Sequence, residues 1–577
     1  ECVLIKQTKS SNLMNKHFSP VSSKTQSVLL HLVWVATALG IVGPTLALLL
    51  SDVSLVAVTN ESLSYRFFYS LRLLNGDGGG IVLPQGHILT VFHHLLHLTA
   101  MPMAERVGVS ILSRLDLFGY LTMGATALIG LALVAKIARA PFLPWHLKLL
   151  VLCAVANFAV GSRSGISAFA TPDYYSLEAL FTGFVMYESA RFLLVPKLPN
   201  PLRPSVLIGG FFAVALSIKI TLLVTAFFPA FALIVRLWDE PRLLMRCLMR
   251  ALLVCSIVSL AIFTLFYAFD PASAVESMLR WRRFVGNPGG ESDFWFNFLF
   301  AWSEKSAPST GYGYALVILP ISAYIIASTL YRYWFRMARS QRFMLIAMLA
   351  TSLVNAYFLI HRPAGTTLWE ASLHCVAAAV TALVLVFPLV ERTKLHTTSY
   401  AGILACVTLV SATINFDKVI NLENFTASSQ IIREITEVTS SYSNLLMIIP
   451  SNDHTAGTLQ EGLMKGMSDF PTWEIKSGKL LLSKVFPGLE FAQDDSRLLD
   501  YTAVMWVDSV EAPLSQGFPR LADRLTRAPA SCRVWRIQTW SWWPRSIYVC
   551  APVPTRTDGG SSETRGPVTR QAERGRS

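Results

Sequence analysis

The sequence predicts a polytopic α-helical membrane protein that carries a small C-terminal α/β or α+β domain. Of the 577 residues, 53% are hydrophobic and only 15% are charged, and the mean hydropathy is +0.47. Soluble domains carry about 25% charged residues, so this composition is typical of chains that lie largely in lipid. Apolar runs of about 20 residues also recur through the first 415 positions, and each is long enough to cross a bilayer. The composition and the runs together predict a helical membrane domain over residues 27–415.

The N-terminal element is predicted to be a short cytoplasmic segment over residues 1–26, followed by a first crossing at 27–50. This apolar run is longer than the hydrophobic core of a cleaved signal peptide. We therefore expect it to be retained as a membrane anchor.

About eleven crossings are predicted in all. Two doubtful runs are a short one at 147–161 and one at 174–195 that carries Glu178 and Glu188. The run at 205–237 is too long for one helix, so we divide it at Lys219, because a charge at mid-bilayer is costly whereas one at a turn reaches water. The remaining apolar runs lie at 27–50, 115–136, 249–269, 312–332, 342–360, 369–390 and 399–414.

The charge pattern predicts that the N-terminus lies inside and the C-terminus outside a bacterial inner membrane. All six segments that this topology places inside are basic, as the positive-inside rule requires. The net charge of +13 is therefore assigned to retained loops, and nucleic-acid binding is not expected. One outside loop, which contains Arg280, Arg282 and Arg283, breaks the pattern.

Four regions are expected outside: a long first loop at 51–114, loops at 162–173 and 270–311, and a periplasmic C-terminal domain at 416–553. In the first loop, residues 88–98 mix apolar positions with His93, His94 and His97 and predict a helix in the membrane interface. The C-terminal domain alternates strand-like runs at 445–450, 503–507, 532–537 and 547–552 with a helical stretch near 455–467. Residues 554–577 lack apolar side chains and are predicted to be disordered.

The cysteines and histidines give little sign of metal chemistry. Cys532 and Cys550 lie on predicted strands, where a disulfide is one alternative and two free thiols the other. His93 and His97 have a spacing that can hold a metal, but no HExxH motif accompanies them, so no metal ligand is assigned and a divalent-metal cofactor stays unknown. Five further cysteines fall in or beside apolar runs and are expected to be small buried hydrophobes: Cys153, Cys247, Cys255, Cys375 and Cys406.

Three short motifs accompany this layout. The first external loop contains Asn60-Glu61-Ser62-Leu63-Ser64-Tyr65, and the second ends in Thr171-Pro172-Asp173 before the run YYSLEALFTGF. The third is Ser217-Ile218-Lys219-Ile220-Thr221, followed by Pro229. In these motifs and in its architecture, the chain over residues 27–390 resembles the GT-C superfamily of membrane glycosyltransferases, especially bacterial protein mannosyltransferases and lipid A aminoarabinose transferases.

The resemblance implies an enzyme that moves a sugar from a polyprenyl-phosphate donor to a periplasmic glycan, lipid or protein. In those families the first loop opens with an Asp-Glu pair. Asn60 replaces the first acid here, so Glu61 becomes the candidate acid and Asp52 its substitute in another register.

The chemistry needs a carboxylate that takes a proton from the acceptor hydroxyl and cations that stabilise the departing phosphate. Glu61 or Asp173 would be the base. The phosphate-binding candidates are Lys219, Arg282, Arg283, His361 and Arg362.

Each assignment has a simpler alternative. Asp173 is placed to cap a helix, Lys219 could extend to the membrane surface, and Arg282 with Arg283 could contact anionic lipid head groups. Two other functions also stay open, a transporter or lipid flippase and a non-catalytic envelope-polymer assembly protein. No internal repeat typical of transporters is seen in the sequence.

Overall fold

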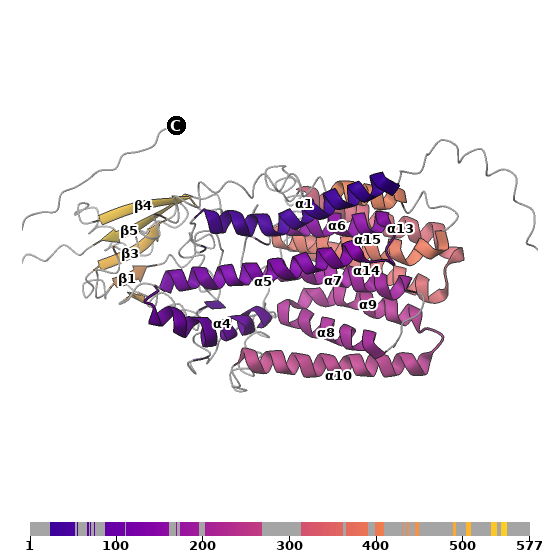
Figure 1. The fold of residues 1–577 in the computed structure, drawn as a ribbon, viewed down its shortest axis with the longest axis horizontal. Helices are drawn as coiled ribbons and strands as arrows, with labels where there is room; N and C mark the ends of the chain where they lie inside the picture. The colour runs from indigo at the N-terminus through magenta and orange to yellow at the C-terminus, as the bar shows by residue number, and fades with distance from the viewer. Residues whose placement is uncertain are drawn as a thin grey trace, which may run out of the picture.

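The computed structural model describes residues 23–51, 87–109, 111–160, 174–195, 202–267, 313–361, 365–390 and 398–408, five strands between 445 and 550, and a few single positions. The described residues are mostly helical, and the helices form one bundle (Figure 1).

All eleven predicted apolar runs coincide with helices. Their bounds are α1 Ser23–Leu50, α5 Ile111–Arg139, α6 Trp145–Val160, α7 Tyr174–Leu194, α8 Leu202–Ile218, α9 Leu223–Arg236, α10 Pro241–Phe266, α13 Gly313–Tyr333, α14 Arg339–His361, α15 Gly365–Val386 and a last helix at 398–408. Among the described residues, three helical stretches, at 24–50, 116–139 and 241–266, are long and apolar enough to cross a membrane. These three are compatible with a membrane protein, and the number of crossings stays a prediction.

The division of residues 205–237 at Lys219 is confirmed as a helix hairpin. Helix α8 ends at Ile218, a short 3-10 turn covers Ile220–Leu222, and α9 follows. The rings of Phe212 and Phe227 pack edge to face with centroids 4.9 Å apart. A continuous helix would separate these two positions by about 22 Å, so the chain must fold back on itself at Lys219.

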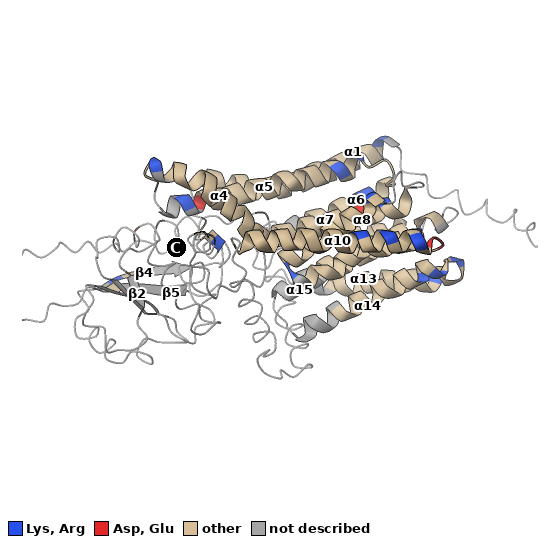
Figure 2. Cartoon of the chain, turned by 90° about the horizontal axis from the view of Figure 1, so that it is seen from below, with Lys and Arg blue, Asp and Glu red and all other residues tan. Residues whose placement is uncertain are grey.

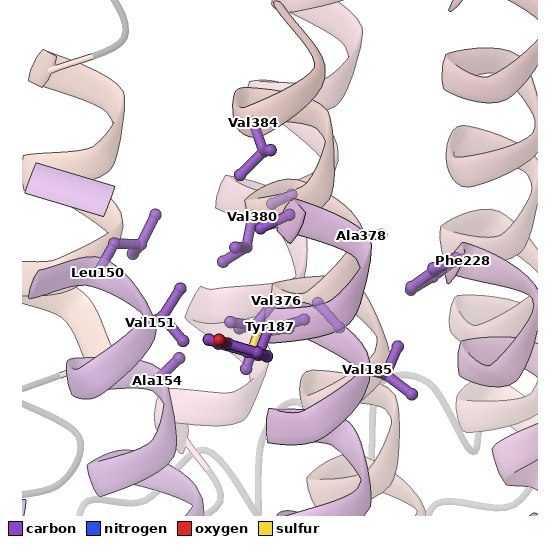
Figure 3. Close-up of a cluster of buried hydrophobic side chains, with 14 of the residues drawn as sticks. Leu150, Val151, Ala154, Val185, Tyr187, Phe228, Val376, Ala378, Val380 and Val384 are labelled. Carbon is purple, nitrogen blue, oxygen red and sulfur yellow. The ribbon is translucent and has the colours of Figure 1, made fainter. Parts of the chain in front are cut away.

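Helix α7 lies at the centre of the bundle, in contact with α5, α6, α8, α9 and α15. Nearly all of its side chains are buried. In Figure 3, Val185 and Tyr187 of α7 lie among residues of α6, α9 and α15, such as Val151, Phe228 and Val380. This position explains why α7 carries apolar residues on every side, with few charged positions among them.

Four threonine hydroxyls inside the bundle are satisfied by their own helices. Thr37, Thr182, Thr381 and Thr408 each donate to the backbone carbonyl four residues earlier, at 2.7 to 2.9 Å. Such bonds remove the cost of burying a hydroxyl and allow threonine to occupy an apolar helix.

Basic residues gather at one end of the bundle. Figure 2 shows Lys and Arg at the end where α1, α10 and α14 begin and α13 finishes. The strands lie beyond the opposite end (Figure 1). This arrangement agrees with the predicted basic inside loops, and the sidedness itself stays a prediction.

The first-loop helix α4 spans His87–Arg106 and is longer than the predicted stretch at 88–98. Its histidines do not face the membrane surface as an interfacial helix would suggest. His93, His94 and His97 are all buried, because this face of α4 packs on α5, α8 and α10.

All four predicted strand-like runs are strands of one five-stranded mixed sheet with the order β2-β1-β3-β5-β4. The helical stretch predicted near 455–467 lies outside the described part of the chain. The bounds are β1 Leu445–Ile448, β2 Leu489–Phe491, β3 Ala503–Asp508, β4 Cys532–Gln538 and β5 Pro544–Cys550. The first three strands pair in parallel, whereas β5 runs antiparallel to β3 and β4.

The strand register places Cys532 of β4 directly opposite Cys550 of β5. A disulfide and two free thiols both stay open as alternatives. Of the other five cysteines, Cys153, Cys247 and Cys375 are buried and Cys255 is half-buried. Cys406 is exposed, contrary to expectation, because the helix at 398–408 buries its opposite face through residues such as Leu404 and Ala405.

Candidate functional site

Lys219 lies at the tip of the α8–α9 hairpin, and its side chain points into the bundle. The expectation that it reaches water is wrong, because only 11% of the side chain is exposed. Its hairpin packs against α7, and α9 also contacts α15. Lys219 Nζ lies 3.6 Å from Oε1 of Glu178, whose side chain is completely buried. The opposite charges compensate each other where neither could lie alone at low cost.

Tyr174, the first residue of α7, connects this pair to a second cation. Lys219 Nζ lies 5.6 Å from the centroid of its ring, and the guanidinium carbon of Arg66 lies 5.5 Å from the same centroid. Both distances fit a cation–π contact. The Tyr174 hydroxyl donates to the hydroxyl of Tyr175 at 2.9 Å. Two cations and one carboxylate therefore gather around one aromatic ring at the start of α7.

Arg66 belongs to the segment between α1 and α4 and is almost completely buried. Its Nη1 donates to Thr90 Oγ1 of α4 at 3.5 Å. Because Arg66 contacts both α4 and Tyr174, it joins the first-loop helix to the hairpin site.

The α4 histidines next to Arg66 are held by hydrogen bonds. His94 Nε2 donates to the carbonyl oxygen of Phe266 at 2.9 Å, and its Nδ1 lies 2.6 Å from Ser70 Oγ. His97 Nε2 donates to the carbonyl oxygen of Phe67 at 2.8 Å. Burial lowers the pKa of His94, and burial together with the charge of Arg66 lowers the pKa of His93 well below its ordinary value. The imidazoles of His93 and His94 are therefore neutral packing groups of the segment between α1 and α5.

His374 of α15 is a further polar residue in the interior near Lys219. The side chain is 1% exposed, and Lys219 is the charged residue that acts on it electrostatically. Within the part of the chain that the structure describes, neither ring nitrogen has a hydrogen-bond partner.

At the other end of α7, Glu188 forms two close ion pairs. Lys136 Nζ of α5 lies 3.0 Å from Oε1, and Arg191 Nε lies 2.7 Å from Oε2. The ammonium of Lys136 also lies 4.6 Å from the Tyr187 ring centroid. The ion pair between Lys136 and Glu188 links α5 to α7. It explains why the apolar run at 174–195 carries Glu188.

The structure places one predicted site residue in a described environment, namely Lys219. Asp173 lies outside the described residues, directly before Tyr174 in the chain. Also outside the described residues are Asp52, Glu61, Arg282, Arg283 and Arg362. His361 is the last residue of α14, and its side chain is likewise not described.

Sequence reasoning missed three members of the site. Arg66 directly follows the Asn60–Tyr65 motif, and Tyr174 directly follows Asp173, so each motif could have been extended by one residue. His374 offered a different signal, because an ionisable side chain within an apolar run is itself unusual.

The described residues contain no group of three or more His, Cys, Asp or Glu side chains placed to hold a metal ion. In comparisons with known proteins, no family model matches the chain and no curated protein matches it significantly.

Proposed function

We propose that this protein is a bacterial inner-membrane glycosyltransferase of the GT-C type. It moves a sugar from a polyprenyl-phosphate donor to a glycan, lipid or protein on the periplasmic side. The basic end of the bundle is cytoplasmic in this proposal, and the sheet belongs to a periplasmic domain.

The observation that carries the proposal is the pair of cations around Tyr174. Lys219 and Arg66 come from segments about 150 positions apart in the chain, and both lie within 6 Å of one ring centroid. A phosphate diester in an apolar setting requires such compensating charge. The bidentate geometry of Arg66 suits phosphate oxygens, and Lys219 adds a second positive charge.

Glu178 is a positioning residue in this scheme. Its buried carboxylate keeps the Lys219 ammonium inside the bundle, where a lone lysine would be costly. When the donor binds, its phosphate would share the ammonium with Glu178.

The reaction itself requires a base at the mouth of the same site. The acceptor hydroxyl oxygen attacks the anomeric carbon while the bond from that carbon to the phosphate oxygen breaks. Asp173 or Glu61 takes the hydroxyl proton, and Lys219 and Arg66 stabilise the polyprenyl phosphate that leaves. Asp173 is favoured by its position, because it precedes the residue whose ring contacts both cations.

A lipid flippase is the second candidate, and the buried charges favour it to some extent. Charged groups in a transport path are often buried in pairs within the membrane. The two functions differ in their product, because a flippase moves the donor intact whereas a transferase releases polyprenyl phosphate.

The decisive experiment measures that release. The full chain is reconstituted in vesicles with mannosyl- or aminoarabinosyl-phosphopolyprenol and a periplasmic membrane extract as acceptor, and free polyprenyl phosphate is quantified. We expect Asp173→Asn, Glu61→Gln or both to lower the rate by about 10² to 10⁴, as loss of a general base does.

Glu240→Gln serves as the control, because Glu240 is an exposed acid at the basic end of the bundle. If Asp173 only caps α7, Asp173→Asn would cost at most about 1 kcal/mol of stability and leave turnover nearly intact. Near-normal rates in both single variants and in the double variant would disprove the transferase mechanism. Movement of intact donor across the vesicle without release would favour the flippase.

A further inference from the structure

His374 differs from the histidines of α4. Each of His93, His94 and His97 has a hydrogen bond through its ring, whereas neither nitrogen of His374 has one among the described residues. His374 is also as deeply buried as they are. A buried polar group that stays unsatisfied destabilises a protein, so such a group requires an explanation.

The surroundings of His374 limit what it could bind. Helix α15 packs against α7, which carries Glu178, and against α9, which begins shortly after Lys219. Lys219 is the charge that acts on His374, and no cluster of metal ligands exists among the described residues. The imidazole is therefore buried within the electrostatic reach of Lys219, the cation that would hold an anionic ligand.

We infer that His374 donates a hydrogen bond to a phosphate oxygen of the lipid-linked donor bound at Lys219. A second positive charge beside the ammonium is unfavourable in an apolar interior, so the ring is neutral and offers one N–H donor and one acceptor nitrogen. A phosphate oxygen accepts only, which matches the N–H. This inference rests on the proposed function and names a residue that contacts the donor.

The test measures binding of polyprenyl phosphate to the full chain in nanodiscs, with uncharged polyprenol as the reference for the lipid tail. His374→Leu removes both nitrogens, and His374→Gln keeps an N–H donor of similar reach. Thr381→Val is the matched control, because Thr381 is buried on the same helix and bonds only its own helix backbone in the described structure.

We expect His374→Leu to weaken binding of polyprenyl phosphate at least tenfold, with polyprenol binding unchanged. His374→Gln should stay within threefold of the parent, and Thr381→Val should not differ from it. The unfolding temperature of His374→Leu should be equal or higher, because leucine removes an unsatisfied polar group.

Unchanged binding in His374→Leu would overturn the inference. So would loss of folding in both His374 variants, since His374 would then be structural. The double variant Lys219→Met with Glu178→Gln separates this failure from that of the proposed function. If the double variant loses binding and His374→Leu keeps it, only the role of His374 is wrong; if both keep it, the phosphate site itself is wrong.

Discussion

Glu178 and Glu188 lie on the same helix, α7, and are both buried, but their cationic partners differ. They lie ten residues apart, or about 15 Å along the helix. Glu188 has partners at 3.0 and 2.7 Å, and these partners, Lys136 and Arg191, are 43% and 32% exposed. Glu178 lies 3.6 Å from Lys219, which is 11% exposed.

This difference separates a structural ion pair from a candidate binding site. Cations that keep contact with water, as at Glu188, can neutralise a carboxylate at little cost, and such a group is stable without a ligand. The ammonium of Lys219 is instead largely withdrawn from water; it shares the Tyr174 ring with the Arg66 cation and acts electrostatically on His374. A cation in that setting is available to an anionic ligand.

The largest expected difference between the Glu178 and Glu188 ends of α7 is the loss of stability when the lysine at each end is replaced. Lys219→Met should lower the free energy of unfolding by about 3 to 5 kcal/mol, because it removes the cation that pairs with the completely buried Glu178 carboxylate. Lys136→Met should cost no more than about 1 kcal/mol, because Glu188 keeps Arg191 and Lys136 is half in water. Unfolding midpoints in mixed micelles would measure both.

A second substitution sharpens this comparison. Adding Glu178→Gln to Lys219→Met removes the buried negative charge that has lost its lysine, and it should restore most of the stability lost in Lys219→Met. Equal losses at the two lysines, or no recovery in the double variant, would show that the two ends do not differ as described.

The next effect concerns the close packing of α8, the helix that precedes Lys219, against α10. A Cβ added to Gly209 would lie 2.4 Å from the carbonyl oxygen of Ala251 in α10, and backbone cannot give way as a side chain can. Gly209→Ala should therefore cost about 1 to 3 kcal/mol. It should also raise hydrogen exchange near Lys219 more than near Glu188.

Gly210→Ala is the control on the same helix. Nothing lies within 4 Å of a Cβ at Gly210, so alanine should be neutral or stabilise by up to about 1 kcal/mol. If both alanine variants behave alike, the close contact of α8 and α10 does not constrain the hairpin.

The sequence predicted the helices well because apolar length alone identifies them. It also located the hairpin, because one lysine in the middle of a 33-residue apolar run has few other solutions. Four of the five described strands were likewise recognisable from their apolar, β-branched and aromatic residues, whereas the three-residue strand β2 was too short to be predicted.

The charge partners could not be predicted in the same way. Glu178 and Glu188 were visible as a problem within an apolar helix, but Lys219 and Lys136 lie 41 and 52 positions away from them. Nothing in the sequence distinguishes which cation reaches which acid, since packing of the helices decides it. For the same reason Lys219 was expected in water, whereas the hairpin turns it inward.

The last expected effect is a pH dependence confined to the Glu178 end of α7. Burial lowers the pKa of His93 and His94 in the folded protein, so the unfolded chain binds protons at a higher pH. Stability is therefore complete above the unfolded pKa of about 6.5 and decreases as the pH falls below it, by about 1.4 kcal/mol per pH unit for each histidine. Helix α4 should loosen first, because both imidazoles pack its buried face, and Arg66 would transmit this change to Tyr174.

Hydrogen exchange measured from pH 7.5 to 5.5 should increase across residues 87–106 before it increases around Lys136 and Glu188. The double variant His93→Gln with His94→Gln should flatten this dependence, whereas His31→Gln should leave it intact, because His31 is exposed on α1. A uniform increase over both ends of α7 would mean that acid acts on the bundle as a whole, and the distinction between its two ends would not extend to their response to pH.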